Sequence, residues 1–232
     1  MPKPPPFHIV FALFPDVTHL DFTGPHQILC RLPGAQVVVA SQAGGEIEAD
    51  GLVFARVARL AEVEHCDLLC VPGGFGTTQA MADAAFLGEL RRLAAGARYV
   101  TSVCTGSLLL GAAGLLKGKR AACHWAWRDQ LALFGAIPDP ARVVRDGNVF
   151  TGGGVTAGVD FALTIAAEIA GPDVAQAIQL AVEYAPDPPF HAGRPETAPP
   201  AVLERVQAIY ARGMDERWAA ARTAGEALSV GA

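Results

Sequence analysis

Cys104 stands where an apolar, β-type segment meets a helical one. Residues 99–103 (Tyr-Val-Thr-Ser-Val) precede it, and the leucine-, alanine- and glycine-rich segment 105–116 follows. A cysteine at such an elbow is predicted to expose its sulfur above the edge of a sheet, facing the N-terminal amides of the helix. These amides favour the thiolate, the nucleophilic form of cysteine. The pattern therefore predicts that Cys104 is a nucleophile.

Asp21 is the second candidate, because it lies between the apolar residues Leu20 and Phe22 near the start of a helical pattern. One interpretation is a helix cap, since aspartate is common at that position. The other is a partly buried carboxyl group, whose ionisation is suppressed by apolar neighbours and by a nearby thiolate. Such a carboxyl group can act as a general acid at neutral pH.

Gly73 and Gly74 follow the apolar segment that ends at Val71. They could simply form a tight turn. Alternatively, their amides could combine with the amide of Thr105 to hold developing negative charge, because glycine lets the backbone approach closely. The loop has neither the lysine of a phosphate-binding loop nor the three spaced glycines of a dinucleotide site, which excludes both nucleotide-binding motifs.

His124 follows a short β-type segment and could activate a cysteine, although a histidine at a strand end is more often a structural hydrogen-bonding group. Gly152 and Gly154 could form a permissive turn, or a hinge that lets the helix starting near Thr156 shift when the charge on Cys104 is neutralised. The other histidines (8, 19, 26, 65 and 191) show no ligand spacing. We therefore expect no metal and no cofactor.

The elements that must position these residues alternate along the chain. Four nearly continuous apolar segments predict strands of a parallel sheet covered on both faces: 8–13, 36–40, 67–71 and 98–103. Helical patterns occupy 20–32, 78–95, 105–116, 125–133, 156–170 and 172–181, and Asp146-Gly147 marks a hairpin within 140–150. This alternation predicts a doubly wound, mostly parallel α/β fold, in which ligands bind at the carboxyl ends of the strands.

The C-terminal part of the chain has a different composition. Residues 186–200 are polar and proline-rich, and we expect them to wrap the domain surface or a neighbouring subunit. A single amphipathic helix is predicted over about 201–227. We see no linker between domains, so the prediction is one domain over 1–232.

Composition excludes several classes of protein. The 232 residues are 51% hydrophobic, carry a formal net charge of -5 and have scattered basic residues, which argues against nucleic-acid binding. No apolar segment approaches the roughly 18 residues of a membrane span, so we expect a cytoplasmic protein without a membrane partner. The five cysteines, at positions 30, 66, 70, 104 and 123, lack framework spacing and are expected to be free thiols.

Together these motifs resemble the ThiJ/PfpI superfamily over nearly the whole chain. The resemblance is carried by Pro72-Gly73-Gly74, Val103-Cys104-Thr105-Gly106, residues 111–120 and His124. It implies a flavodoxin-like fold of the class I glutamine amidotransferase type and a homodimer.

Within the superfamily, longer strings resemble the isocyanide hydratases: 20–26, 101–107, 124–125, 143–148, 151–154 and 183–186. Many superfamily members carry glutamate where this chain has Asp21. The resemblance implies addition of water to an isocyanide through a Cys104 thioimidate, with Asp21 as general acid and base. Thr105 would orient Asp21 or the water, and Gly73 and Gly74 would shape the pocket.

Rival functions use the same elbow. A glyoxalase, peptidase or protective hydrolase of the superfamily would more often carry glutamate at position 21 and a better-supported histidine. A thiol-based sensor of oxidative stress would turn over no substrate. The ligand-sensing half of a transcription regulator is disfavoured, because the single helix predicted after Pro200 is too short for a helix-turn-helix domain.

Overall fold

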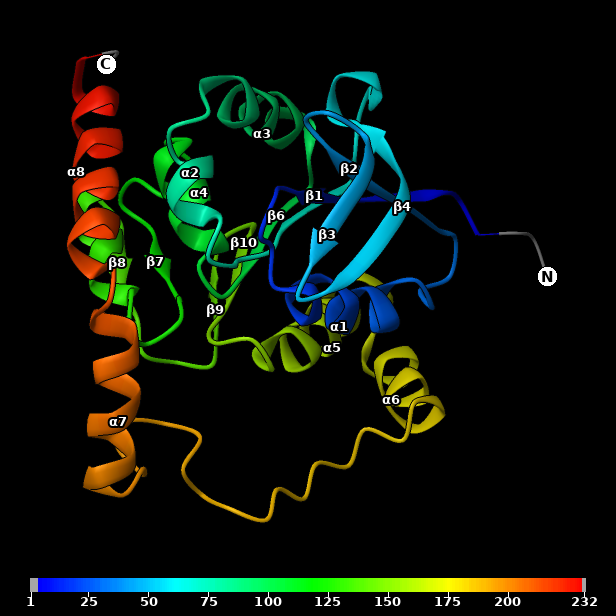
Figure 1. Ribbon diagram of the computed structural model, residues 1–232. Helices are drawn as coiled ribbons and strands as arrows, with labels where there is room; N and C mark the ends of the chain where they lie inside the picture. Colours follow the sequence, from blue (N-terminus) through cyan, green and yellow to red (C-terminus); the bar gives the residue numbers. More distant parts are fainter. Residues whose placement is uncertain (1–3, 231–232) are drawn as a thin grey trace.

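An eight-stranded sheet forms the middle layer of the computed structural model, which describes residues 4–230 (Figure 1). Its strand order is β3-β4-β2-β1-β5-β6-β10-β9, parallel from β4 to β10 and antiparallel at both edges. The parallel strands are β4 (Leu52–Arg59), β2 (Ala35–Ser41), β1 (Phe7–Leu13), β5 (Leu68–Val71), β6 (Tyr99–Val103) and β10 (Val149–Gly152), and the edge strands are β3 (Gly45–Ala49) and β9 (Val143–Asp146). The predicted mostly parallel sheet is therefore confirmed.

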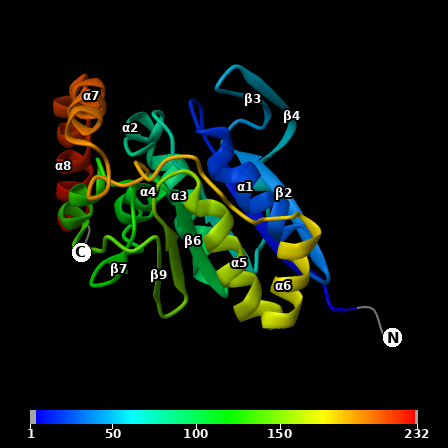
Figure 2. The ribbon, with the colours of Figure 1, turned by 90° about the horizontal axis from the view of Figure 1, so that it is seen from below.

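Helices cover both faces of this sheet, as Figures 1 and 2 show. One face carries α1 (His19–Leu29) and α5 (Ala157–Ala170), with α6 (Pro172–Ala181) packed on α5. The other carries α2 (Thr77–Ala80), α3 (Ala84–Gly96) and α4 (Gly106–Ala112). Every residue of β5 and β6 is buried, which explains why these strands read as continuous apolar or small residues rather than as an alternating pattern.

The central strands have the flavodoxin-like order β2-β1-β5-β6-β10. After β1 the chain first forms β2 on one side of it and later β5, β6 and β10 on the other side. β1 lies between β2 and β5, so the connections that leave β1 and β5 diverge at their carboxyl ends. In open α/β sheets this divergence creates a crevice for ligands. The segments after β1, β5 and β6 are those that carry Asp21, the glycine pair and Cys104.

The C-terminal segment forms two helices where one was predicted. They are α7 (Pro200–Ala211) and α8 (Met214–Val230), and they are separated by Gly213, whose φ of 77° ends the helical path. α8 packs on α4 and on a 3₁₀ segment, Arg128–Phe134, whereas α7 has no buried residue. The chain between α6 and α7 extends away from the sheet before it returns to α7 (Figure 1).

Other differences concern local signals. The predicted helix 78–95 is split into α2 and α3, because Asp83 accepts a hydrogen bond from the Phe86 amide (3.0 Å) and starts a new helix. The predicted helix 125–133 is the 3₁₀ segment. The hairpin of β3 and β4, which turns at Asp50-Gly51, was not predicted, nor was the small sheet of β7 (Arg120–Ala121) and β8 (Ile137–Pro138).

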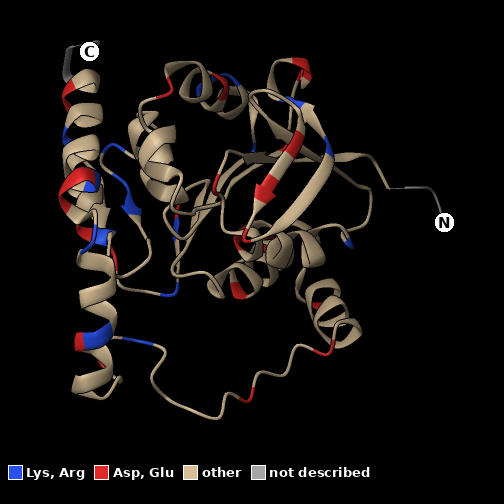
Figure 3. Cartoon of the chain, viewed as in Figure 1, with Lys and Arg blue, Asp and Glu red and all other residues tan. Residues whose placement is uncertain are grey.

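Charged residues are spread over many elements (Figure 3). Over residues 4–230, no helix combines the length and the apolar character that crossing a membrane requires. Residues 1–3 and 231–232 of the predicted domain lie outside the described residues.

Candidate active site

Cys104 occupies a sharp turn between β6 and α4. Its φ of 58° is in the left-handed region, which a cysteine adopts only when its surroundings hold it there. The restraint comes from its own amide, which donates to the carbonyl oxygens of Gly152 (3.1 Å) and Gly153 (2.8 Å) at the end of β10. The predicted strand-to-helix elbow is present, and two neighbouring strands fix it.

The environment of the Cys104 sulfur differs from the prediction, because the residue is only 5% exposed. Burial and the nearby Asp21 carboxylate raise the pKa of the thiol well above its usual value, although the Thr105 amide donates to the sulfur and opposes this. The expected exposure of the sulfur is therefore wrong, and its burial disfavours the thiolate. Desolvation of the sulfur thus opposes the expected effect of the helix N-terminal amides.

Asp21 lies in the first turn of α1 and is completely buried. Its Oδ2 accepts a hydrogen bond from the Gly73 amide (2.9 Å), and its buried Oδ1 has no partner among the described residues. Burial raises the pKa of the carboxyl group to about 7, despite the lowering effects of the Gly73 amide and the Cys104 thiol. Thr18 stands at the N-cap of α1, so the capping interpretation of Asp21 is wrong.

The tip of the β3–β4 hairpin also acts on this carboxyl group. Asp50 accepts a hydrogen bond from the amide of His19, the first residue of α1 (3.0 Å), and its negative charge further raises the pKa of Asp21. Sequence reasoning missed this contact because the hairpin itself was not predicted.

The loops after β1 and β5 are joined to each other, which brings Asp21 to the glycine pair. Val17 pairs with Gly74, and the Thr18 amide donates to the carbonyl of Gly73 (2.9 Å). A Cβ atom at Gly73 would lie 2.5 Å from the Thr105 amide nitrogen and 2.9 Å from Asp21 Oδ2. Only glycine fits here.

The amides of the glycine pair are already used within the protein. Gly73 donates to Asp21, and Gly74 donates to the Thr105 hydroxyl (3.0 Å). The expectation that both amides face developing negative charge is therefore wrong. They position Asp21 and Thr105 instead.

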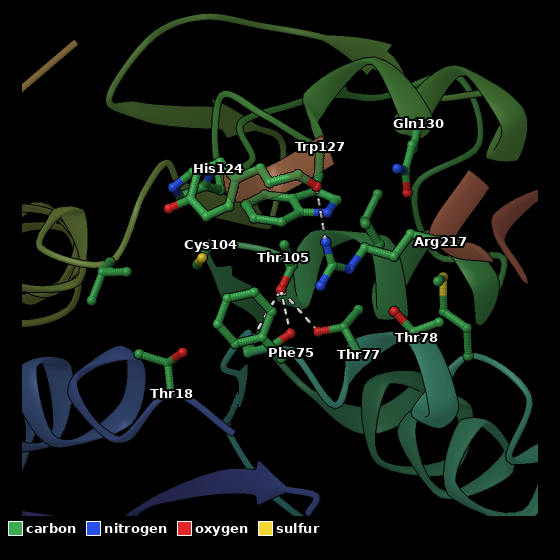
Figure 4. Close-up of a pocket in the computed structure, with 15 residues that line it drawn as sticks. Thr18, Phe75, Thr77, Thr78, Cys104, Thr105, His124, Trp127, Gln130 and Arg217 are labelled. Atoms are coloured by element: carbon green, nitrogen blue, oxygen red, sulfur yellow. Dashed lines mark hydrogen bonds between the residues drawn. The ribbon is translucent and has the colours of Figure 1, made fainter. Parts of the chain in front are cut away.

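The Thr105 hydroxyl also hydrogen bonds with Thr77 Oγ1 (2.8 Å), as Figure 4 shows. Its hydroxyl contacts are thus to the Gly74 loop and to α2 rather than to the Asp21 carboxylate. The backbone amide of Thr105 is the group directed at the sulfur.

His124 lines the same pocket as Cys104 and is buried. Burial lowers the pKa of its imidazole to about 4, so the ring is neutral at physiological pH. Its Nδ1 accepts from the Ala126 amide (3.3 Å), which leaves the proton on Nε2. A cationic His124 that activates the thiol is therefore not supported, whereas hydrogen-bond donation by Nε2 is available.

Gly152 and Gly154 belong to the connection between β10 and α5. A Cβ atom at Gly154 would lie 3.3 Å from the His124 ring, and one at Gly152 would lie 3.4 Å from the Cβ of Phe161 in α5. The segment that holds the Cys104 amide is thus continuous with the start of α5. This placement is compatible with the hinge hypothesis.

The pocket above Cys104 has a volume of about 540 Å³, including its open mouth. Its walls are aromatic: the Trp127 ring lies 4.7 Å from that of Tyr210 and 6.3 Å from that of Phe75, measured between centroids. Tyr210 comes from α7, and Arg217 reaches in from α8 (Figure 4). Sequence reasoning missed these residues, because they come from separate segments and no spacing links them to Cys104.

Comparisons with known proteins agree with this geometry. The DJ-1/PfpI family model matches residues 8–168. The chain is 53% identical over 200 residues to an isonitrile hydratase of Pseudomonas putida, covering 86% of this chain and 88% of that protein. A crystal structure of a ThiJ/PfpI family protein from Pseudomonas syringae superposes with a TM-score of 0.91 at 42% identity, over 95% of this chain and 92% of that one.

A more distant relative shares the core of the fold. The crystal structure of Drosophila melanogaster DJ-1beta superposes with a TM-score of 0.69 at 26% identity. The match covers 78% of this chain and 100% of the DJ-1beta chain. The resemblance drawn from the sequence is confirmed. With its flavodoxin-like sheet and its buried cysteine at the β6–α4 elbow, this chain belongs to the DJ-1/PfpI family.

Proposed function

We propose that this protein is an isonitrile hydratase, which adds water to an isocyanide R–N≡C and releases the formamide R–NH–CHO. The observation that carries the proposal is the electrostatic pairing of Cys104 with the buried Asp21 carboxyl group. The identity with the Pseudomonas putida hydratase supports it over most of the chain.

The first half of the reaction needs one proton to move. Because the pKa of Asp21 is about 7 and that of the thiol is raised, Asp21 ionises as pH rises through 7 while the thiol keeps its proton. Asp21 takes the thiol proton while the sulfur attacks the terminal carbon of the isocyanide. Asp21 then delivers that proton to the same carbon, giving the thioimidate R–N=CH–S–Cys.

The second half consumes water. The Asp21 carboxylate removes a proton from the water whose oxygen adds to the thioimidate carbon, and that proton passes to nitrogen. The adduct R–NH–CH(OH)–S–Cys then collapses. The C–S bond breaks, its electron pair stays on sulfur, and the hydroxyl proton returns to the Cys104 and Asp21 side chains. Asp21 Oδ1, buried and without a partner among the described residues, is the atom suited to these transfers.

The remaining site residues hold the reacting groups in position. Gly73 fixes Asp21 Oδ2, and Gly74 fixes the Thr105 hydroxyl, so that the Thr105 amide stays directed at the sulfur. We propose that neutral His124 donates from Nε2 toward the substrate nitrogen or the added water. The aromatic walls bind the organic group and exclude bulk water.

The direct test is formamide production from an aryl isocyanide. Wild type should produce formamide, Cys104→Ala should produce none, and Cys66→Ala should keep activity because that buried cysteine lies outside the pocket. Acid quenching should trap a Cys104 adduct heavier by the full mass of the isocyanide, since nothing leaves during addition. Full activity in Cys104→Ala would rule out the proposed route.

The same preparation separates the rival functions. Methylglyoxal turnover without isocyanide turnover would indicate a glyoxalase of the same family. Oxidation without turnover of any substrate would indicate a sensor. The buried Cys104 thiol with its raised pKa argues against a sensor, because sensing cysteines are exposed and of low pKa.

We also propose that the protein acts as a cytoplasmic homodimer. Supporting this, Leu180, Phe190 and Ile209 are exposed along α6, the extended segment and α7. Light scattering during size exclusion tests the dimer, and a monomer at micromolar concentration would contradict it.

A further inference from the structure

Arg217 gives the pocket a positive charge. Among the described residues that line it, Arg217 is the only arginine or lysine, and no aspartate or glutamate accompanies it. Its guanidinium carbon lies 5.2 Å from the ring centroid of Phe75 and 5.4 Å from that of Trp127. Figure 4 shows the guanidinium between Trp127 and Thr77, on one side of the cavity, with Cys104 on the other.

The hydrogen-bonding capacity of this guanidinium is largely unused. Nη1 donates to the carbonyl oxygens of Tyr210 and Arg212, both at 3.5 Å, which is long for such a bond. Within residues 4–230, Nη2 and Nε have no hydrogen-bond partner and Arg217 forms no ion pair. A half-buried guanidinium whose Nη2 and Nε lack hydrogen-bond partners among the described residues is suited to a carboxylate. It can bind the two carboxylate oxygens through two parallel hydrogen bonds.

Gln130 provides a second, independent observation. Its side chain is completely buried and lines the pocket, its Oε1 has no partner among the described residues, and its Nε2 donates only to the Met214 sulfur at 3.8 Å. A thioether is a weak acceptor, and either end of an amide can be turned toward a ligand. Thr78 and Gln130 lie on the side of the pocket away from Cys104 (Figure 4).

We propose that the substrates are isocyanides that carry a carboxylate. The isocyanide carbon meets Cys104, the organic body lies between Phe75 and Trp127, and the carboxylate binds Arg217 with Thr78 and Gln130 nearby. The product is a formamide that carries the same carboxylate. This inference rests on the proposed function. His124 does not compete for the anion, because its low pKa keeps it neutral.

The test compares 4-isocyanobenzoate with its methyl ester, which has the same reacting group and no charge. The measured quantity is the ratio of kcat/KM for the acid to that for the ester. Wild type should favour the acid by about tenfold or more, which is the order expected for one charge-assisted hydrogen-bonded pair.

Variants assign this preference to one residue. Arg217→Gln should abolish it, chiefly through KM for the acid, and Arg217→Lys should keep part of it because the charge remains without the planar fork. Arg222→Gln is the matched control, since Arg222 is an exposed arginine on the same helix outside the pocket. It should leave the ratio unchanged.

Two outcomes would overturn the inference: a wild-type preference for the ester, or an equal fall for both substrates in Arg217→Gln. The second would mean that Arg217 only holds the pocket in shape. If wild type hydrates neither compound, the proposed function fails, and calorimetric titration with 4-formamidobenzoate decides the carboxylate subsite separately. Binding that Arg217→Gln weakens would support the subsite, and no binding to wild type would refute it.

Discussion

Asp21→Asn should make the protein more stable while removing its activity. The Asp21 carboxyl group is completely buried and its Oδ1 has no partner among the described residues, so ionising it in the folded state is costly. Asparagine has nearly the same shape, can still accept the hydrogen bond from Gly73, and carries no charge. The substitution therefore removes the cost of ionisation and also the group that takes the thiol proton and delivers it to the isocyanide carbon.

The size of the gain follows from the pKa. Burial raises the pKa of Asp21 from 3.8 to about 7. A carboxyl group whose pKa is raised on folding loses stability as pH rises between the unfolded and folded values, by about 1.4 kcal/mol for each pKa unit. The gain from Asp21→Asn should thus be about 2 kcal/mol at about pH 5 and about 4 kcal/mol at about pH 8.

Urea unfolding followed by circular dichroism at these two pH values measures the gain. Asp187→Asn, which removes one negative charge from an exposed position in the extended segment, controls for net charge. In the same samples, kcat/KM for an aryl isocyanide should fall by about 100-fold or more in Asp21→Asn, as for loss of a general acid and base. A stability difference that does not grow with pH, or a variant less stable than wild type at about pH 8, would refute the reasoning.

Four further predictions concern the same site. Wild-type kcat/KM should rise with pH through about 7 as Asp21 ionises and becomes a base for the thiol. A flat pH profile after subtraction of the acid-catalysed background would contradict this. Asp50→Asn should move the lower limb of that profile to lower pH, because it removes a negative charge that raises the pKa of Asp21; an unmoved limb would exclude the hairpin tip from the site. Gly73→Ala should cost about 2 kcal/mol or more in unfolding free energy and most of the activity, because its Cβ would collide with the Thr105 backbone. Gly88→Ala in α3, where a Cβ atom meets open space, should instead be neutral or stabilising by up to about 1 kcal/mol, and equal effects of the two alanines would disprove the packing argument. Gly152→Thr should slow the pre-steady-state phase that follows thioimidate formation if the start of α5 must shift, and unchanged transients would remove the hinge hypothesis.

Local sequence was sufficient for the strands β1, β2, β5 and β6 of the sheet and for the elbow. The apolar segments that became β1, β5 and β6 are buried almost throughout, so their pattern predicts strands covered on both faces. The segment that became β2 is equally apolar, although most of its residues are only partly buried. Cys104 could likewise be placed, because the change from strand to helix occurs at that residue. The β3–β4 hairpin and the break in the C-terminal helix were missed although both carry a turn signal in the sequence, Asp50-Gly51 and Gly213, whose φ angles are positive.

Contacts between distant segments decided the chemistry of the site. Asp21 lies 52 residues from the Gly73 amide that holds it, and the wall of the pocket needs Tyr210 and Arg217 from the last two helices. The periodicity of apolar residues along the chain does not predict contacts between residues so far apart in the sequence.

The sequence by itself determined that this protein has a doubly wound sheet with a cysteine at a strand-to-helix elbow and an aspartate near the first helix start. Only the tertiary structure decided that the Cys104 sulfur is buried rather than exposed, and that burial raises the pKa of Asp21 to about 7. The physical reason is that secondary structure follows from neighbours along the chain, whereas the ionisation of a buried group depends on how completely distant segments remove water from it.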